Sequence, residues 1–248
     1  WKAARRRAAA ALVFVLCASA VLIPPARAAT TVRASSQNSA TTGTALSVTA
    51  PTGTTTGDVV IVVVTEDGQG RTITDNNGGT PFTKDLGVSA FSTMTQQVWS
   101  RRIVAGDPTT YNFTTNISDD WSIIAVTFQN PHAAAIYDVV PSATQDTTSD
   151  DTNIDCPDIT TVNSNSLHVV FGSSDSSALT ITGIPSTYTA LENITTTGVR
   201  RTRSAYKLIA SPGATGVQTF TSNTNAVQIG ISMAIRDVGG GSLIFPDP

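Results

Sequence analysis

Short apolar runs rich in β-branched residues alternate with turns rich in Gly, Asn and Asp along most of the chain. Val59–Val64 is unbroken and apolar, which is typical of a strand buried on both faces. The same reading predicts further strands over 45–50, 82–88, 93–104, 111–115 and 121–128. No stretch of ten residues or more shows a convincing helical pattern. The pattern therefore predicts an all-β protein.

The hydrophobic pattern recurs along the chain at a spacing of 107 residues. Val60–Val64 is echoed by Leu167–Phe171, Trp99 by Tyr206, Phe113 by Phe220 and Phe128 by Ile235. A recurrence at one fixed spacing indicates a supersecondary unit that is used more than once. We therefore expect two pseudo-repeats, at about 45–130 and 159–238.

Two such units can interleave into one sandwich or fold as two small domains. We expect residues 29–43 to be a flexible lead-in and residues 129–151 to be a linker between the repeats. A single jelly-roll-like β-sandwich over 29–238 would hide strand edges better than two separate domains. The interleaved sandwich is therefore the favoured architecture, and two domains stay the alternative.

Comparing the two copies predicts which face of the last strand is buried. Every second position is apolar in both copies, and these positions should face a shared core: Ile124, Val126, Phe128, Ile231, Met233 and Ile235. The other face carries Trp121 in the first copy and Gln228 in the second. We therefore expect Trp121 to lie outside the main core.

An outward tryptophan on a sandwich suggests a ligand-binding role. A flat indole can stack on the apolar face of a pyranose ring, and Tyr111 and Asn112 are expected nearby. The alternative is that Trp121 covers a sheet edge or packs under a loop, since single exposed aromatic residues are common.

The first 28 residues match a secretory leader. A basic start is followed by the apolar stretch Leu12–Ile23 and by Ala26-Arg27-Ala28, which suits cleavage before Ala29. The Ala- and Arg-rich composition is typical of bacteria. We expect the mature protein to be secreted or held at the cell surface, and residues 239–248 to form a flexible Gly-rich tail.

Charge and cysteine content narrow the range of partners. The chain has 15 Lys+Arg and 18 Asp+Glu, and five of the basic residues lie in the leader, which leaves 10 against 18, or −8. Such an acidic surface argues against binding nucleic acid, or a membrane once the leader is cleaved. Cys156 alone remains after cleavage, so an internal disulfide is excluded and a partly buried thiol is expected.

The residue types offer little for catalysis. The two histidines, His132 and His168, belong to no metal or nucleophile motif. One acidic segment could supply several of the oxygens that calcium takes: Asp150, Asp151, Asn153, Asp155 and Asp158. Its spacing is not that of an EF-hand, and a solvated loop is the alternative. No other cofactor is expected.

The order of these motifs resembles that of a known type of module. Gly57-Asp58 before the apolar run, Val98–Asp107, Tyr111–Thr114 and Trp121–Ala125 together look like uncharacterised β-sandwich modules of secreted bacterial and phage-associated proteins. The resemblance covers most of residues 45–237 and implies a β-sandwich fold. The chain departs from it at Pro81-Phe82-Thr83, where a Gly-Trp pair is expected.

The sequence favours a secreted, non-enzymatic surface or adhesion module that binds a glycan or a neighbouring surface protein. One alternative is a structural subunit or spacer of an extracellular fibre, with Leu243–Phe245 docking on a neighbour. Another is a hydrolase acting on polysaccharide, because the separation of two carboxylates cannot be read from a sequence.

Overall fold

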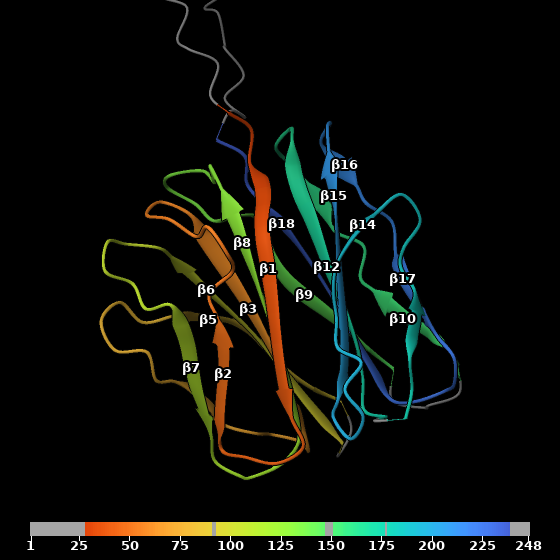
Figure 1. The fold of residues 1–248 in the computed structure, drawn as a ribbon. Helices are drawn as coiled ribbons and strands as arrows, with labels where there is room; N and C mark the ends of the chain where they lie inside the picture. Colours follow the sequence, from red (N-terminus) through yellow and green to blue (C-terminus); the bar gives the residue numbers. More distant parts are fainter. Residues whose placement is uncertain (1–27, 91–92, 147–150, 177, 239–248) are drawn as a thin grey trace, which may run out of the picture.

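A computed structural model describes residues 28–90, 93–146, 151–176 and 178–238, and all regular elements within these ranges are β-strands (Figure 1). The all-β prediction is confirmed. The described ranges contain no helix of the length and hydropathy that a membrane span needs. The leader, apart from Ala28, and the Gly-rich tail with Leu243–Phe245 lie outside the described residues.

The first half of the chain forms two antiparallel sheets. The large sheet has the order β1-β8-β3-β6-β5 and the small sheet the order β2-β7-β4. The strands are β1 (Thr31–Ala40), β2 (Ala45–Thr49), β3 (Val59–Asp67), β4 (Ile73–Asp75), β5 (Thr83–Ala90), β6 (Met94–Arg102), β7 (Thr110–Thr115) and β8 (Trp121–Gln129).

The second half repeats both sheets. The large sheet has the order β9-β18-β12-β15-β14, the small sheet has the order β10-β17-β13, and β11 and β16 form an extra pair. The strands are β9 (Tyr137–Asp146), β10 (Asn153–Cys156), β11 (Thr160–Thr161), β12 (Ser166–Ser174), β13 (Ile181–Gly183), β14 (Thr189–Asn193), β15 (Arg201–Ile209), β16 (Gly213–Ala214), β17 (Gln218–Ser222) and β18 (Gln228–Ile235).

The four principal sheets stack as small, large, large, small, from left to right in Figure 1. One core lies between the large sheets and is built from β3, β8, β12 and β18 of both halves, which contribute Ile61, Val126, Val169 and Met233 among others. A separate core lies under each small sheet. Apolar runs such as β3 are buried on both faces for this reason.

Each half has the strand order of a jelly roll, except that β5 and β14 pair within the large sheets. The β-sandwich built from two pseudo-repeats is therefore confirmed. The arrangement differs from interleaving, because no sheet formed by the described residues mixes strands of the two halves. The molecule consists of two jelly rolls packed back to back.

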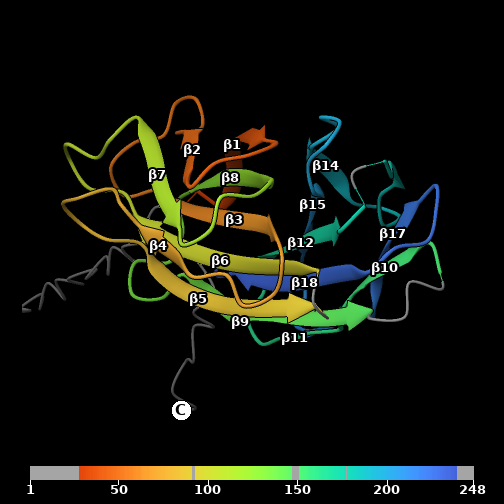
Figure 2. The same cartoon turned by 90° about the horizontal axis from the view of Figure 1, so that it is seen from below.

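A pseudo-twofold axis relates the halves. Edge strand β5 runs beside β9 (Figure 2), where Tyr137 Oη donates to Asp85 Oδ2 over 2.7 Å. The equivalent edges β1 and β14 also meet, and there Ser35 Oγ donates to Glu192 Oε1 over 2.6 Å. The large sheets thus cover each other's edges, which are otherwise open to pairing with another chain.

Four polar side chains form a hydrogen-bonded group within the interface between the large sheets, and Ser122 Oγ extends it at 3.1 Å from Thr202 Oγ1. Gln96 Nε2 donates to Ser173 Oγ (2.5 Å) and Thr65 Oγ1 (3.1 Å), and Thr202 Oγ1 lies 3.0 Å from the same two oxygens. Thr65 and Ser173 occupy equivalent places in the two halves, as do Gln96 and Thr202. Buried polar groups need such partners, because an unpaired one costs about 1–3 kcal/mol.

The copies do not match at one constant spacing. Phe128 and Ile235, 107 residues apart, pair with Val59 and Leu167, which are 108 apart. On β6 and β15 the equivalent positions are 106 apart, so Trp99 matches Ala205, and Tyr206 instead faces the central core. The predicted match of Trp99 with Tyr206 is wrong, because one residue gained or lost in a turn moves a side chain to the other face.

Two predicted irregular segments are strands. The expected flexible lead-in 29–43 contains β1, and the expected linker 129–151 contains β9. Both are edge strands of the large sheets and are mostly half-buried, so polar and small residues suffice along them. The repeats therefore begin earlier than predicted, at β1 and β9.

Candidate functional site

The aromatic residues expected to bind sugar are buried. Trp121 is 3 % exposed and Tyr111 is 0 % exposed, and both belong to the core under the small sheet of the first half. The prediction that Trp121 faces outward is wrong, because the β2-β7-β4 sheet covers that face of β8. Asn112 is exposed, and its backbone is bonded to Asn77. These three side chains do not form a stacking surface.

The expected calcium ligands are divided between two places. Asp151, Asn153 and Asp155 line one small pocket. Asp158 lies apart from it and accepts a hydrogen bond from Gly216 N over 2.7 Å. Asp150 lies outside the described residues. The structure thus groups three of the five predicted residues.

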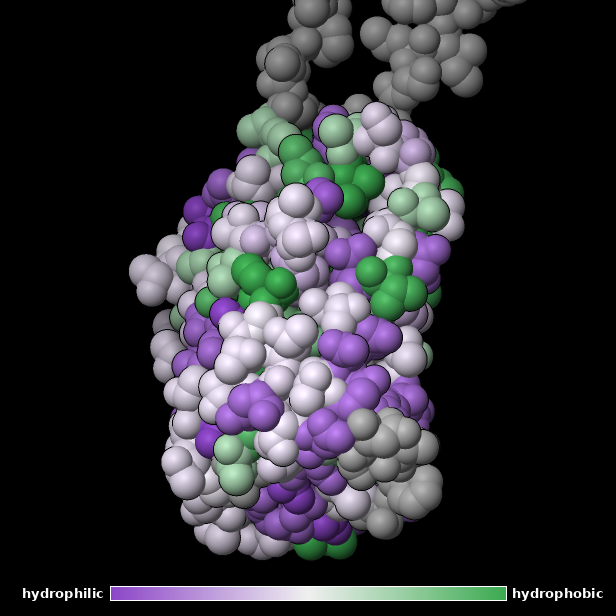
Figure 3. Space-filling view, turned by 90° about the vertical axis from the view of Figure 1, so that its right-hand side faces the viewer, coloured by the Kyte–Doolittle hydropathy of each residue, from purple (hydrophilic) through white to green (hydrophobic). Residues whose placement is uncertain are grey.

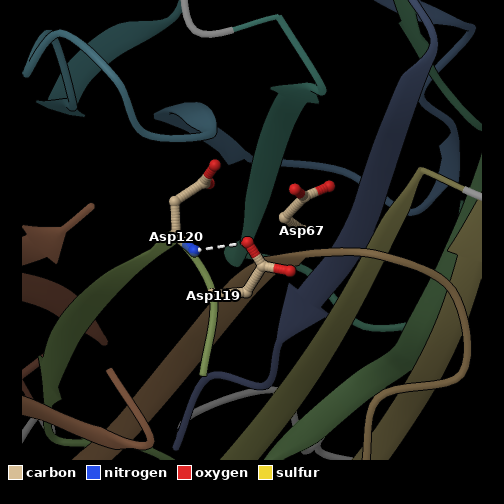
Figure 4. Close-up of side chains that lie close together, drawn as sticks. All are labelled: Asp67, Asp119 and Asp120. Carbon is tan, nitrogen blue, oxygen red and sulfur yellow. Dashed lines mark hydrogen bonds between the residues drawn. The ribbon is translucent and has the colours of Figure 1, made fainter. Parts of the chain in front are cut away.

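A different acidic cluster lies where β3 ends and β8 begins. Asp67, Asp119 and Asp120 bring carboxylate oxygens within 4.8 Å of one another (Figure 4). Asp120 N donates to Asp119 Oδ1 over 3.0 Å, shown as the dashed line. Asp67 is far from Asp119 and Asp120 in the sequence, and the antiparallel pairing of β3 with β8 brings them together.

Arginines already compensate the charge of this cluster. Arg71 Nη2 pairs with Asp119 Oδ2 over 2.7 Å. Arg200, from the second half, pairs with Asp67, and its backbone N–H donates to Asp120 Oδ1 over 3.0 Å. The cluster is therefore an ion-pair network that ties the two halves together, and its geometry alone does not require a metal ion.

Burial raises the pKa of two acidic side chains in this region. The Glu66 side chain is fully buried, and this desolvation raises its pKa to about 7, although Thr115 donates to it and lowers the value. Desolvation likewise raises the pKa of Asp120 to about 6, against the opposing charge of Arg200. A raised pKa is useful in a general acid, but no substrate can reach Glu66 beneath Thr115.

A cleft of about 500 Å³ lies at one end of the first half. Its walls are the β2–β3 loop and the β6–β7 loop. The loops are bonded at both ends of the cleft, by Ala50 N to Thr109 O and by Gly57 N to Ile103 O, each over 2.9 Å. Between these bonds they separate, and the lining residues are Thr49, Ala50, Pro51, Thr52, Gly53, Thr54, Thr55, Thr56, Ile103, Val104, Gly106, Asp107, Pro108, Thr109 and Tyr111.

The equivalent loops of the second half are closed. There β11 pairs with β16, Thr160 opposite Ala214 and Thr161 opposite Gly213. Thr215 N also donates to Ile159 O over 2.9 Å. The second half thus shows how this fold seals the end of the sandwich, and the cleft is a departure from that arrangement in the first half.

Two buried polar side chains of the cleft region have atoms without a protein hydrogen-bond partner among the described residues. Tyr111 Oη is one, and burial raises the pKa of this phenol to about 12, which keeps it protonated. The others are Nε and Nη1 of Arg101, whose side chain is 1 % exposed and pairs with Asp107. Arg101 and Asp107 line a second hollow of about 330 Å³ on the other side of the β6–β7 loop.

The histidine and cysteine side chains that the structure describes are either hydrogen-bonded within the fold or buried. His168 Nδ1 lies 2.6 Å from Tyr188 Oη, and burial lowers the pKa of this imidazole to about 4. Cys156 is fully buried, and burial strongly raises the pKa of its thiol. His132 caps its own loop by accepting from Ala134 N and Ala135 N, each over 3.2 Å.

Comparison with known proteins gives no assignment: no family model matches the chain, and no curated protein or solved structure is significantly similar to it.

Proposed function

We propose that the protein is an extracellular, non-enzymatic binding module and that the cleft between the β2–β3 and β6–β7 loops holds a stretch of glycan. The observation that carries the proposal is the difference between the halves. The equivalent loops pair with each other in the second half. In the first half they separate between two hydrogen bonds and leave a cleft of about 500 Å³. Binding pockets of ordinary size begin at about 300 Å³.

The lining suits a polyhydroxylated ligand. The threonines of both loops offer hydroxyl groups that can donate or accept, as the hydroxyl groups of a sugar do. Pro51, Pro108 and the partly exposed Val104 offer apolar contact for the carbon face of a ring. Tyr111 Oη, which belongs to the cleft lining, adds a donor that a ligand oxygen would satisfy.

The extracellular assignment is supported by the secretory pattern of residues 1–28 and by the acidic charge that remains after cleavage. The non-enzymatic assignment is supported by the enclosure of Glu66, His168 and Cys156. The mutual covering of β1 with β14 and β5 with β9 favours a binding module over a fibre subunit that offers a sheet edge to its neighbour.

The cleft can be tested by blocking it. Thr52 is exposed and lines the cleft, so Thr52→Trp places an indole in the ligand volume without burying it in the fold. We expect the unaltered protein to bind a subset of polysaccharides in a pull-down and glycan array, and T52W to bind at least tenfold more weakly.

The matched control is Ser186→Trp, an exposed loop position of the second half. S186W should bind like the unaltered protein, and both variants should keep its unfolding temperature. Absence of glycan binding by the unaltered protein, or equal binding by T52W, would refute the proposal.

A further inference from the structure

In the first half a tryptophan fills the space beside β8, whereas the equivalent space beside β18 in the second half is open. Trp121 of β8 reaches the β1–β2 loop, where its Nε1 is 3.6 Å from the place of a Cβ on Gly43. Its equivalent on β18 is Gln228. In place of the indole the second half has a pocket of about 90 Å³ between β9, β18 and the start of β10. We propose that this pocket is a calcium-binding site.

Oxygen-bearing side chains dominate the pocket. It is lined by Thr144, Asp146, Asp151, Asn153, Asp155, Gln228 and Gly230. Three of these residues are aspartates, and none is a lysine or an arginine. In the Asp67–Asp119–Asp120 cluster, in contrast, Arg71 and Arg200 pair with the carboxylates.

The Gln228 side chain supports a cation site independently of the aspartates. The residue is 1 % exposed, and its Nε2 donates to the backbone oxygen of Asp151 over 3.3 Å. Its Oε1 is buried and has no protein hydrogen-bond partner among the described residues. A buried amide oxygen normally has a partner, and a hard cation at the pocket would provide one.

A close approach of two strands positions Asp155 at the pocket. A Cβ on Gly230 would clash with the backbone of Asp155 and lie 2.8 Å from Cys156 N. Glycine at this position lets β10 lie directly against β18. Its equivalent in the first half is Ile123, so the approach is specific to the second half.

The chemistry favours calcium over magnesium. Calcium accepts six to eight oxygens in flexible geometry, including carboxylates, amide carbonyls and water. The pocket's carboxylates are not gathered as closely as those of the Asp67 cluster. Asp151 and Asp155 are exposed and can rotate towards a cation, and the pocket has room for bound water.

The test is calcium titration of the chelator-treated protein by calorimetry, together with thermal unfolding in calcium and in magnesium. We expect one calcium per chain and a calcium-specific rise in unfolding temperature. The double variant Asp151→Asn, Asp155→Asn should bind at least tenfold more weakly. Gln228→Leu should weaken binding without altering a charge.

Asp158→Asn is the matched control, because Asp158 lies in the same acidic segment but outside the pocket. It should bind calcium like the unaltered protein. Absence of calcium binding at millimolar concentration, equal binding by the double variant, or loss of binding only in Asp119→Asn would each overturn the proposal. The site is in the other half from the glycan cleft, so either proposal can fail alone.

Discussion

At the scale of single residues, Glu66 is an acid held where its charged form is poorly solvated. Its pKa rises from 4.5 to about 7, chiefly by burial. In the unfolded chain the same group ionises near its ordinary value. Between about pH 4.5 and 7 the folded state therefore keeps the proton of Glu66, whereas the unfolded state loses it. The stability that this proton uptake contributes is fully present below pH 4.5 and is lost as the pH rises through 7.

Glu66→Gln should remove this dependence. The glutamine amide cannot ionise and can still accept a hydrogen bond from Thr115 Oγ1. We expect E66Q to match the unaltered protein at pH 4.5 and to be more stable at pH 8, by up to about 3 kcal/mol at about 1.4 kcal/mol per pKa unit. Urea unfolding at both pH values measures this.

The chain's other glutamate provides the control, since Glu192 lies at the contact of β1 with β14. Glu192→Gln should not reproduce the gain at pH 8. An E66Q protein that loses stability at pH 8 would show instead that the ionised carboxylate supports the fold.

At the scale of strands, the close fit of β10 against β18 depends on Gly230. Gly230→Ala should destabilise the protein by about 2 kcal/mol or more, because the new methyl group meets backbone atoms that cannot rotate away. Gly87→Ala on β5 is the comparison, with its nearest heavy atom at 4.0 Å, and should be close to neutral. Equal unfolding midpoints for the two variants would contradict this account.

The sequence predicted strands better than their faces. Apolar runs such as β3 and β8 were predictable, because burial on both faces demands continuous hydrophobicity. β1 and β9 were not, since edge strands tolerate polar residues. The exposure of Trp121 was mispredicted because the β2-β7-β4 sheet, which covers this face, leaves no trace in the alternation of residues along β8.

The candidate sites were harder to predict than the strands. Thr52–Thr56 has the composition of an ordinary turn, and only the closed loops of the second half show that it opens a cleft. Asp151 and Asp155 were singled out from sequence. Gln228 was not, because its role depends on the missing indole beside it.

At the scale of the whole molecule, the halves should unfold together. They share the central core, and Arg200 of one half bonds to Asp67 of the other. The outward face of the second half, in contrast, shows hydrophobic residues separated by polar ones (Figure 3). The broad apolar faces of the two large sheets are thus buried against each other within one chain.

Phe220→Ala tests this coupling. Phe220 lies in the second half's own core, whereas Trp99 and Trp121 report on the first half by fluorescence. A loss of about 3–5 kcal/mol should lower the fluorescence transition and the circular dichroism transition alike, by roughly 10 °C. A fluorescence transition that stays in place would mean that the halves unfold independently.

The pseudo-twofold axis has a consequence for specialisation. A symmetric pair of separate, identical jelly rolls would have to present the same loops at both ends, so any opening would appear twice. Joining both copies in one polypeptide removes that constraint while the hydrogen-bonded group of Thr65, Gln96, Ser173 and Thr202 still registers them. One end can then stay sealed while the other is free to diversify.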